Sequence, residues 1–254
     1  MMCAVGSAVS SPDLYETQKY DLPHPPAPMP ARARDRGIRV KDGETIAFLG
    51  DSITRLGGGE KGYIALVLKA LEVAGVKNVQ AVRAGCDGQN AGDMLGRVGG
   101  ILANEEVKVL TVSCGVNDIW GYDWGRGVEL ETYEQNVREI YDKAARSGVL
   151  VVPLTPTLIQ EDPDNDENRQ LNLFADFIRA EAKRRALPLA DCRRAEVDAL
   201  AKLPQTGERH FTYDGVHPVA AGHRLIAREV VKVLGVPENL MPQIEEVWDR
   251  FLAE

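Results

Sequence analysis

From residue 37 onward, short apolar runs alternate with longer amphipathic stretches, and this alternation constrains the fold more than any other feature. The apolar runs are rich in leucine or β-branched residues, as are strands buried on both faces. They cover residues 45–49, 79–82, 107–113, 150–154 and 187–190. Strands that alternate with helices form a parallel sheet with helices packed on both faces, so the pattern predicts an α/β fold around a sheet of about five strands.

The amphipathic stretches predict the helices that cover this sheet. They span residues 63–74, 91–103, 130–146, 167–185, 218–234 and 241–251. Gly75 follows the first of them and is typical of a helix stop. Pro218 opens the fifth and suits a first helical turn. We therefore expect one domain over residues 37–254. Residues 1–36 are crowded with prolines between 23 and 30 and predict an extended or poorly ordered N-terminal arm.

Composition and charge exclude several classes of partner. The formal net charge of −8 disfavours nucleic acid and anionic membranes, because both bind basic surfaces. No apolar stretch approaches the roughly 18 residues of a membrane-spanning helix, and no intact signal peptide is evident. We expect a soluble protein, either cytoplasmic or secreted with any signal peptide absent from this chain. The sequence does not indicate its oligomeric state.

Four cysteines occur, and their spacing matches no zinc or thioredoxin pattern. Cys114 and Cys192 end apolar runs and are predicted to be buried free thiols. Cys86 is interpreted as structural, and Cys3 lies in the N-terminal arm.

The first predicted strand ends in Gly50-Asp51-Ser52, which places a serine at the carboxyl end of the sheet, where open α/β folds bind ligands. A base for this serine is available in Asp214-Gly-Val-His217-Pro218. A carboxylate on one imidazole nitrogen fixes the tautomer and leaves the other nitrogen free to accept the serine proton. Simpler interpretations remain open, namely a helix-capping serine and a surface turn with an incidental histidine.

Two further segments follow predicted strands on the same side of the sheet. Gly85 and Gly88 lie after the second strand and allow the backbone to approach a ligand closely. Asn117 lies after the third strand, and its amide can donate a hydrogen bond to an oxyanion. Each segment could equally be an ordinary turn or cap.

Together, in this order, the four segments resemble the blocks of the SGNH hydrolase superfamily, the GDSL-type esterases, over roughly residues 44 to 235. The resemblance implies a flavodoxin-like α/β/α sandwich and hydrolysis without metal or cofactor, through an acyl-serine intermediate. It implies a catalytic triad of Ser52, Asp214 and His217. The implied oxyanion hole combines the backbone N–H groups of Ser52 and Gly88 with the Asn117 side chain. Arg83 and Arg55 depart from residues common among relatives and could reshape the cleft.

The superfamily includes carbohydrate acetylesterases, lipases, lysophospholipases and thioesterases, and the fold does not choose among them. Trp120, Tyr122 and Trp124 follow Asn117 and could either stack on a sugar or pack the loop. We predict a short-chain acetylesterase acting on O-acetylated carbohydrate, with Asp51, Arg55, Trp120 and Trp124 as candidate substrate contacts. The alternatives are a lysophospholipase or thioesterase and, in another class, a non-catalytic carbohydrate-binding module.

Overall fold

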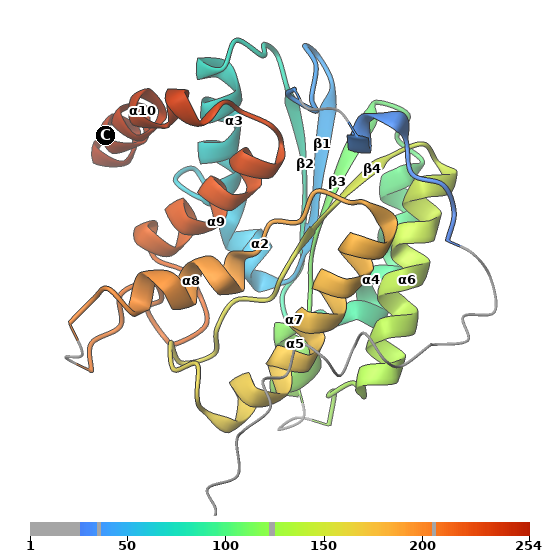
Figure 1. The fold of residues 1–254 in the computed structure, drawn as a ribbon, viewed down its shortest axis with the longest axis vertical. Helices are drawn as coiled ribbons and strands as arrows, with labels where there is room; N and C mark the ends of the chain where they lie inside the picture. Colours follow the sequence, from blue (N-terminus) through green and yellow to red (C-terminus); the bar gives the residue numbers. More distant parts are fainter. Residues whose placement is uncertain (1–25, 35–36, 122–124, 205–206) are drawn as a thin grey trace, which may run out of the picture.

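The computed structural model describes residues 26–34, 37–121, 125–204 and 207–254. Its centre is a parallel sheet in which four strands are hydrogen-bonded in the order β2-β1-β3-β4 (Figure 1). The strands are β1 (Thr45–Gly50), β2 (Gln80–Gly85), β3 (Val107–Ser113) and β4 (Leu150–Leu154). This order is flavodoxin-like, and the chain reverses direction across the sheet between β1 and β3.

Helices cover both faces of the sheet and complete the three layers. On one face lie α3 (Tyr63–Val73), α8 (Cys192–Leu200), α9 (Ala220–Val233) and α10 (Met241–Ala253), on the left of Figure 1. On the other lie α4 (Ala91–Leu102), α6 (Leu130–Arg146) and α7 (Asp166–Arg185). Two short helices, α2 (Ser52–Gly57) and α5 (Val116–Trp120), directly follow β1 and β3, and the 3-10 turns are η2 (Ala31–Arg34) and η4 (Glu238–Leu240). The predicted α/β/α sandwich is confirmed.

Within the described ranges the sheet has four strands, where about five were expected. The fifth predicted run contributes only a single parallel bridge between Leu154 and Ala190. Ala190 donates its N–H to Pro153 O at 2.9 Å, and Thr155 donates to Ala190 O at 3.1 Å. Pro188 has no N–H to give, so a longer ladder with β4 cannot be built at this position.

The helix predicted from Pro218 begins later, at Ala220. Pro218 instead forms an antiparallel bridge with Thr212, and Val219 donates its N–H to Phe211 O at 2.8 Å. Pro218 and Val219, which were predicted to form the first turn of the helix, therefore pair with residues 211–212 instead. Residues 210–219 consequently fold back on themselves in front of α9.

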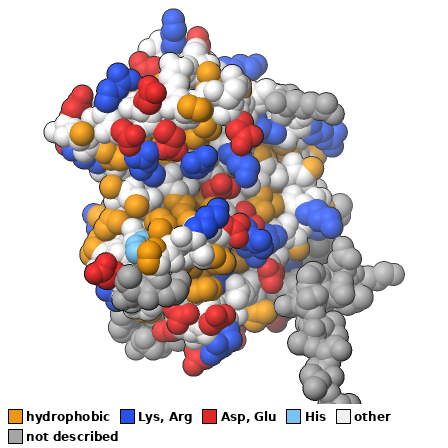
Figure 2. Space-filling model, turned by 60° about the vertical axis from the view of Figure 1, so that its left-hand side comes forward, with side chains coloured by type: hydrophobic (Ala, Val, Ile, Leu, Met, Phe, Trp, Pro, Cys, Tyr) orange, Lys and Arg blue, Asp and Glu red, His pale blue; other side chains and the backbone are white. Residues whose placement is uncertain are grey.

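The core forms around β1, whose six residues are all buried. Trp248 of α10 is fully buried and donates its indole N–H to Leu66 O at 2.9 Å, which fixes the last helix on α3. Cys114 and Cys192 are buried free thiols, as expected, whereas Cys86 is exposed. Cys3 lies outside the described residues. In the surface view of Figure 2, hydrophobic side chains reach the surface across the middle of the molecule, and charged ones gather above them.

Part of the predicted N-terminal arm packs on the domain. Ala33 is buried, and Arg32 forms two hydrogen bonds, of 2.8 and 2.9 Å, with the Glu44 carboxylate just before β1. The rest of the arm, and the predicted boundary at residue 36, lie outside the described residues. Within the part of the chain that the structure describes, no helix has the length and apolar character needed to cross a membrane.

Candidate active site

Ser52 is the first residue of α2, and only Asp51 separates it from the buried end of β1 at Gly50. Asp51 is the N-cap of this helix. Its carboxylate accepts the Ile53 N–H at 2.9 Å, which satisfies one of the free donors of the first turn. Asp51 is only 2% exposed, and burial raises its pKa to about 6. The strand end and the cap together hold Ser52 at the carboxyl edge of the sheet.

A continuous hydrogen-bonded chain links Ser52, His217 and Asp214. His217 Nε2 lies 2.9 Å from Ser52 Oγ, and His217 Nδ1 lies 2.6 Å from Asp214 Oδ2. Burial raises the pKa of Asp214, but hydrogen bonds from the His217 backbone and ring outweigh this effect and hold the pKa below its ordinary value. The ionised carboxylate can only accept a hydrogen bond, so the proton of this pair is carried by His217 Nδ1. The neutral imidazole therefore presents Nε2 as the acceptor for the serine proton.

The loop before α9 has a local reason to place both partners together. Asp214 Oδ1 accepts the backbone N–H groups of Val216 at 3.0 Å and His217 at 2.8 Å. The side chain thus closes a turn around Gly215 while its other oxygen meets the imidazole. Tyr213 donates its N–H to His217 O at 3.0 Å and closes the same turn from the backbone.

Two aromatic rings flank the imidazole of His217. Tyr213 stacks on it with ring centroids 5.7 Å apart and an interplanar angle of 19°, and is itself 59% exposed. Trp120, at the end of α5, meets it edge-on at 6.5 Å. Sequence reasoning selected Trp120 but missed Tyr213, although its place directly before Asp214 was an available signal. Tyr122 and Trp124 lie outside the described residues.

The two segments expected to stabilise an oxyanion are joined to each other. Asn117, on α5, is 7% exposed and donates one side-chain N–H to Gln89 O at 3.1 Å. Gln89 follows Gly88, which is exposed and has φ +67°, a conformation that favours glycine. An amide carries two N–H donors, so this bond fixes the Asn117 side chain and leaves a second donor. The participation of Gly88 and Asn117 in an oxyanion hole stays a prediction.

Two polar side chains that the sequence analysis did not select, the buried Asp118 and the half-buried Arg97, support these loops. Asp118 is fully buried and accepts the Ala91 N–H at 3.0 and 3.2 Å, which ties α5 to the start of α4; burial raises its pKa to about 7. Arg97 of α4 donates to Gly50 O at 2.8 Å and Ala84 O at 2.7 Å, the carbonyls at the ends of β1 and β2. These contacts fix the edge on which the site is built.

Two of the four candidate substrate contacts have other partners. The buried Asp51 carboxylate caps α2, and this burial does not fit a direct contact with substrate. Arg55 is half exposed and pairs with Asp87 on the loop before Gly88. The guanidinium therefore lies near the expected site but is already paired with a carboxylate. Among the described residues, no cluster of three or more His, Cys, Asp or Glu side chains could hold a metal ion.

Comparison with known proteins supplies an independent line of evidence. Residues 48–225 match the model of the GDSL-like lipase/acylhydrolase family. An acetylxylan esterase from Geobacillus stearothermophilus is 23% identical over 215 residues, which cover 78% of this chain and 97% of that protein.

Solved structures agree on the fold. One of that esterase superposes with a TM-score of 0.69 at 22% identity, covering 78% of this chain and 97% of the esterase. The structure of an α/β hydrolase from the metagenome of Lake Arreo, Spain, superposes with a TM-score of 0.69 at 24% identity, covering 79% of this chain and 99% of that protein. The family model matches more than half of the sequence and contains most of the elements described above. The family match and the esterase relative together support a carboxylic ester hydrolase. The chain therefore belongs to the GDSL-like lipase/acylhydrolase family.

Proposed function

We propose that this protein is a serine esterase that removes short acyl groups, acetyl above all, from O-acetylated carbohydrate. The observation that carries the proposal is the hydrogen-bonded chain from Ser52 Oγ through His217 to Asp214, at the carboxyl end of β1. Nucleophile, base and orienting carboxylate are the three parts that acyl transfer through serine requires. A binding module on the same scaffold would need none of them in this arrangement.

In the first half-reaction, Ser52 Oγ attacks the ester carbonyl while His217 Nε2 takes the hydroxyl proton. Negative charge then develops on the former carbonyl oxygen. The backbone N–H groups of Ser52 and Gly88 and the second side-chain N–H of Asn117 are proposed to donate to it. The intermediate collapses by breaking the bond to the alcohol oxygen, which leaves with the proton from His217.

In the second half-reaction, His217 takes a proton from water as the water oxygen attacks the acyl-serine. The second tetrahedral intermediate breaks the bond to Ser52 Oγ, which recovers the proton from His217. The products are the deacylated sugar hydroxyl and the carboxylic acid. Asp214 stays ionised throughout and stabilises the imidazolium that forms in each half.

The preference for a carbohydrate acetate is supported by two features. One relative is an acetylxylan esterase, and its solved structures include catalytic mutants in which a serine, an aspartate or a histidine is replaced, the last two lying three positions apart as Asp214 and His217 do here. The second feature is the aromatic pair beside the imidazole: the exposed face of Tyr213 and the half-buried Trp120 offer flat apolar surface of the kind that packs against a sugar ring.

An acyl-length series separates this function from a lipid or thioester hydrolase. We expect kcat/KM on p-nitrophenyl esters to be highest for acetyl and to fall by butyryl, because each methylene left in water forgoes up to about 0.8 kcal/mol. Acetylated xylooligosaccharides should be deacetylated as well. Better turnover of octanoyl esters or acyl thioesters would favour the alternative.

Replacement of the nucleophile tests the mechanism itself. Ser52→Ala should lose acyl-enzyme formation and most activity while keeping the fold, since the substitution removes one hydroxyl, which hydrogen-bonds to His217, and leaves the backbone of α2 unchanged. A serine-directed phosphonate should label the wild-type protein once, at Ser52. Labelling at another serine, or full activity in Ser52→Ala, would refute the assignment.

A further inference from the structure

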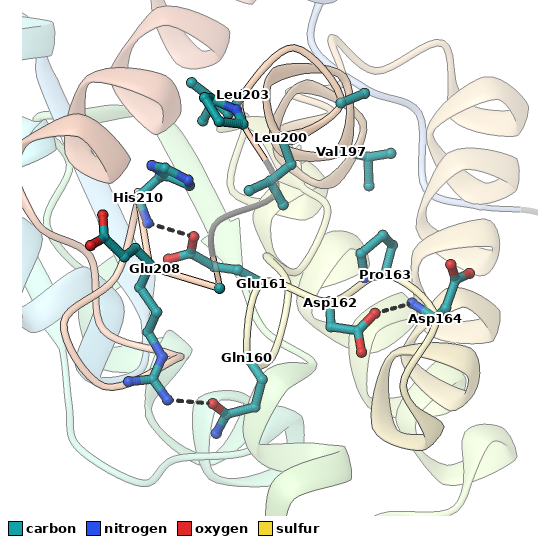
Figure 3. A pocket seen from close by; sticks show the side chains of 14 residues that line it. Gln160, Glu161, Asp162, Pro163, Asp164, Val197, Leu200, Leu203, Glu208 and His210 are labelled. Atoms are coloured by element: carbon teal, nitrogen blue, oxygen red, sulfur yellow. Dashed lines mark hydrogen bonds between the residues drawn. The ribbon is translucent and has the colours of Figure 1, made fainter.

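Glu161, in the loop between β4 and α7, binds the segment that leads into the catalytic loop. One carboxylate oxygen accepts three hydrogen bonds, from Phe211 N at 3.0 Å, Thr212 N at 2.6 Å and Thr212 Oγ1 at 2.6 Å. The other oxygen accepts His210 N at 2.8 Å, the bond drawn in Figure 3. A single side chain therefore fixes three consecutive residues.

Gln160, the neighbour of Glu161, holds the same segment at its two ends. The backbone N–H of Gln160 donates to the carbonyl oxygen of Gly215, the residue after Asp214, at 2.6 Å. The side-chain oxygen of Gln160 accepts a hydrogen bond from Arg209 Nη2 at 2.8 Å. We call Gln160 and Glu161 the clamp.

The backbone of the clamp is in an uncommon conformation. Gln160 has φ +62° and Glu161 has φ +53°, so two successive residues with side chains lie in the left-handed region. Such a conformation costs free energy and persists only where surrounding contacts determine it. Here the six hydrogen bonds to residues 209–215 supply those contacts.

The clamped segment is the one that sets the position of His217. Residues 211–213 pair with 217–219: Tyr213 N donates to His217 O, and Val219 N donates to Phe211 O. This pairing joins Glu161 to the backbone of His217 through one hydrogen-bonded ladder. The imidazole must meet Ser52 Oγ across 165 positions of sequence, so the placement of this loop decides whether the two groups meet.

We propose that Glu161, supported by Gln160, is a positioning residue that fixes the loop carrying Asp214 and His217 against Ser52. The inference rests on the proposed function, because it assigns His217 as the base. Burial raises the pKa of Glu161, but the Thr212 hydroxyl and the three backbone N–H groups outweigh this effect, so the carboxylate is ionised when it accepts them. Its loss should act on catalysis through the geometry of the base, without any contact to substrate.

Glu161→Gln tests the proposal with little change of shape. The amide can replace only one of the two acceptor oxygens, so its NH₂ group must face backbone N–H donors. Asp164→Asn is the matched control, because it removes one negative charge from the same loop and the same cavity of about 780 Å³. The hydrogen bonds described for Asp164 involve its backbone and residues 162 and 169, and none of the six bonds to residues 209–215. Both variants are assayed on p-nitrophenyl acetate, with active sites counted by phosphonate labelling.

We expect Glu161→Gln to lower kcat per labelled site by about 10- to 100-fold with KM little changed, the usual effect of a misplaced catalytic group. The midpoint of its kcat/KM pH profile should move to lower pH, because a poorly aligned Asp214 stabilises the imidazolium less. Asp164→Asn should match the wild type in both. Partial unfolding cannot imitate this pattern, since it changes neither kcat per labelled site nor the midpoint.

Two outcomes overturn the proposal. In the first, Glu161→Gln keeps the wild-type kcat per labelled site and the wild-type midpoint of the kcat/KM pH profile. In the second, Asp164→Asn loses as much kcat per labelled site as Glu161→Gln. If Glu161→Gln does not fold, Thr212→Val removes only the hydroxyl bond and should still lower kcat per site by a few-fold; an unchanged kcat in that variant refutes positioning. Failure of the proposed function is distinguishable, because the wild-type protein would then lack esterase activity and phosphonate labelling altogether.

Discussion

The burial of Asp51 beside the nucleophile has a measurable cost that Asp51→Asn should remove. The carboxylate is 2% exposed, and desolvation raises its pKa from 3.8 to about 6 despite the hydrogen bond from Ile53 N and the favourable interaction with His217. That rise corresponds to about 3 kcal/mol between the two protonation states. Asparagine caps helices as well as aspartate does and keeps an oxygen for Ile53 N, so the substitution changes mainly the charge.

The sign follows from proton binding. Between pH 3.8 and about 6, the folded state holds the Asp51 proton and the unfolded state has lost it, so this group makes the wild-type protein less stable as the pH rises through that window. Above pH 6 both states are ionised and the loss is complete. Asp51→Asn has no such dependence. Relative to the wild type, its free energy of unfolding should therefore increase by about 3 kcal/mol between pH 4 and pH 8.

Urea unfolding of both proteins at pH 4, 6 and 8 measures this difference, in which the contributions of titrating groups that do not interact with Asp51 cancel. Circular dichroism and tryptophan fluorescence should give coincident transitions, so that a two-state analysis applies. The argument would be refuted if the free energy of unfolding of Asp51→Asn minus that of the wild type stayed constant with pH, or if it decreased as the pH rises. It would mean that the carboxylate is stabilised as an anion by more than the one cap bond described.

Two further predictions concern the site and the core. Asn117→Ala should lower kcat by roughly 10²–10³ with KM little changed, because the lost donor acts on charge that develops in the transition state; steady-state kinetics on an acetate ester would contradict this if KM rose at constant kcat. His223 is 8% exposed, its Nδ1 has no hydrogen-bond partner among the described residues, and burial lowers its pKa from 6.5 to about 4. The stabilisation from this group is complete above pH 6.5 and is lost, by about 3 kcal/mol, as the pH falls to about 4. In urea unfolding, the free energy of unfolding of the wild type minus that of His223→Gln should therefore decrease as the pH falls over that range.

The long elements of the fold follow from sequence periodicity. The helix predicted over residues 130–146 has the same bounds in the structure, and the strands predicted at 107–113 and 150–154 are also reproduced. These segments bury a continuous face or run, so burial alone decides them. The errors occur where a local signal competes with a distant partner. Pro218 alone predicts a helix start, but it pairs with Thr212, and α9 begins only at Ala220.

The short helices at the site could not be predicted in the same way. α2 has six residues and α5 has five, too few to show a helical period. Their presence depends on caps and on ties to other loops, such as Asp51 to Ile53 N and Asp118 to Ala91 N. Of the residues involved, sequence reasoning selected Asp51 as a candidate substrate contact and passed over Asp118. Side-chain oxygens that bind backbone N–H groups leave no periodic pattern in the sequence.

Carboxylates and amides bound to backbone recur at every loop of the candidate site. Asp51 fixes the turn that carries Ser52, Asn117 fixes the loop after Gly88, and Asp214 closes its own turn before His217. Glu161 does the same for the segment one step further out. The sheet supplies a common edge, while these bonds set the positions of the groups that must meet to within hydrogen-bond distance. Substitutions that remove such a side-chain bond to the backbone should therefore reduce kcat more than their cost in stability would suggest. Truncations of the apolar core residues beneath the site should instead reduce stability more than kcat.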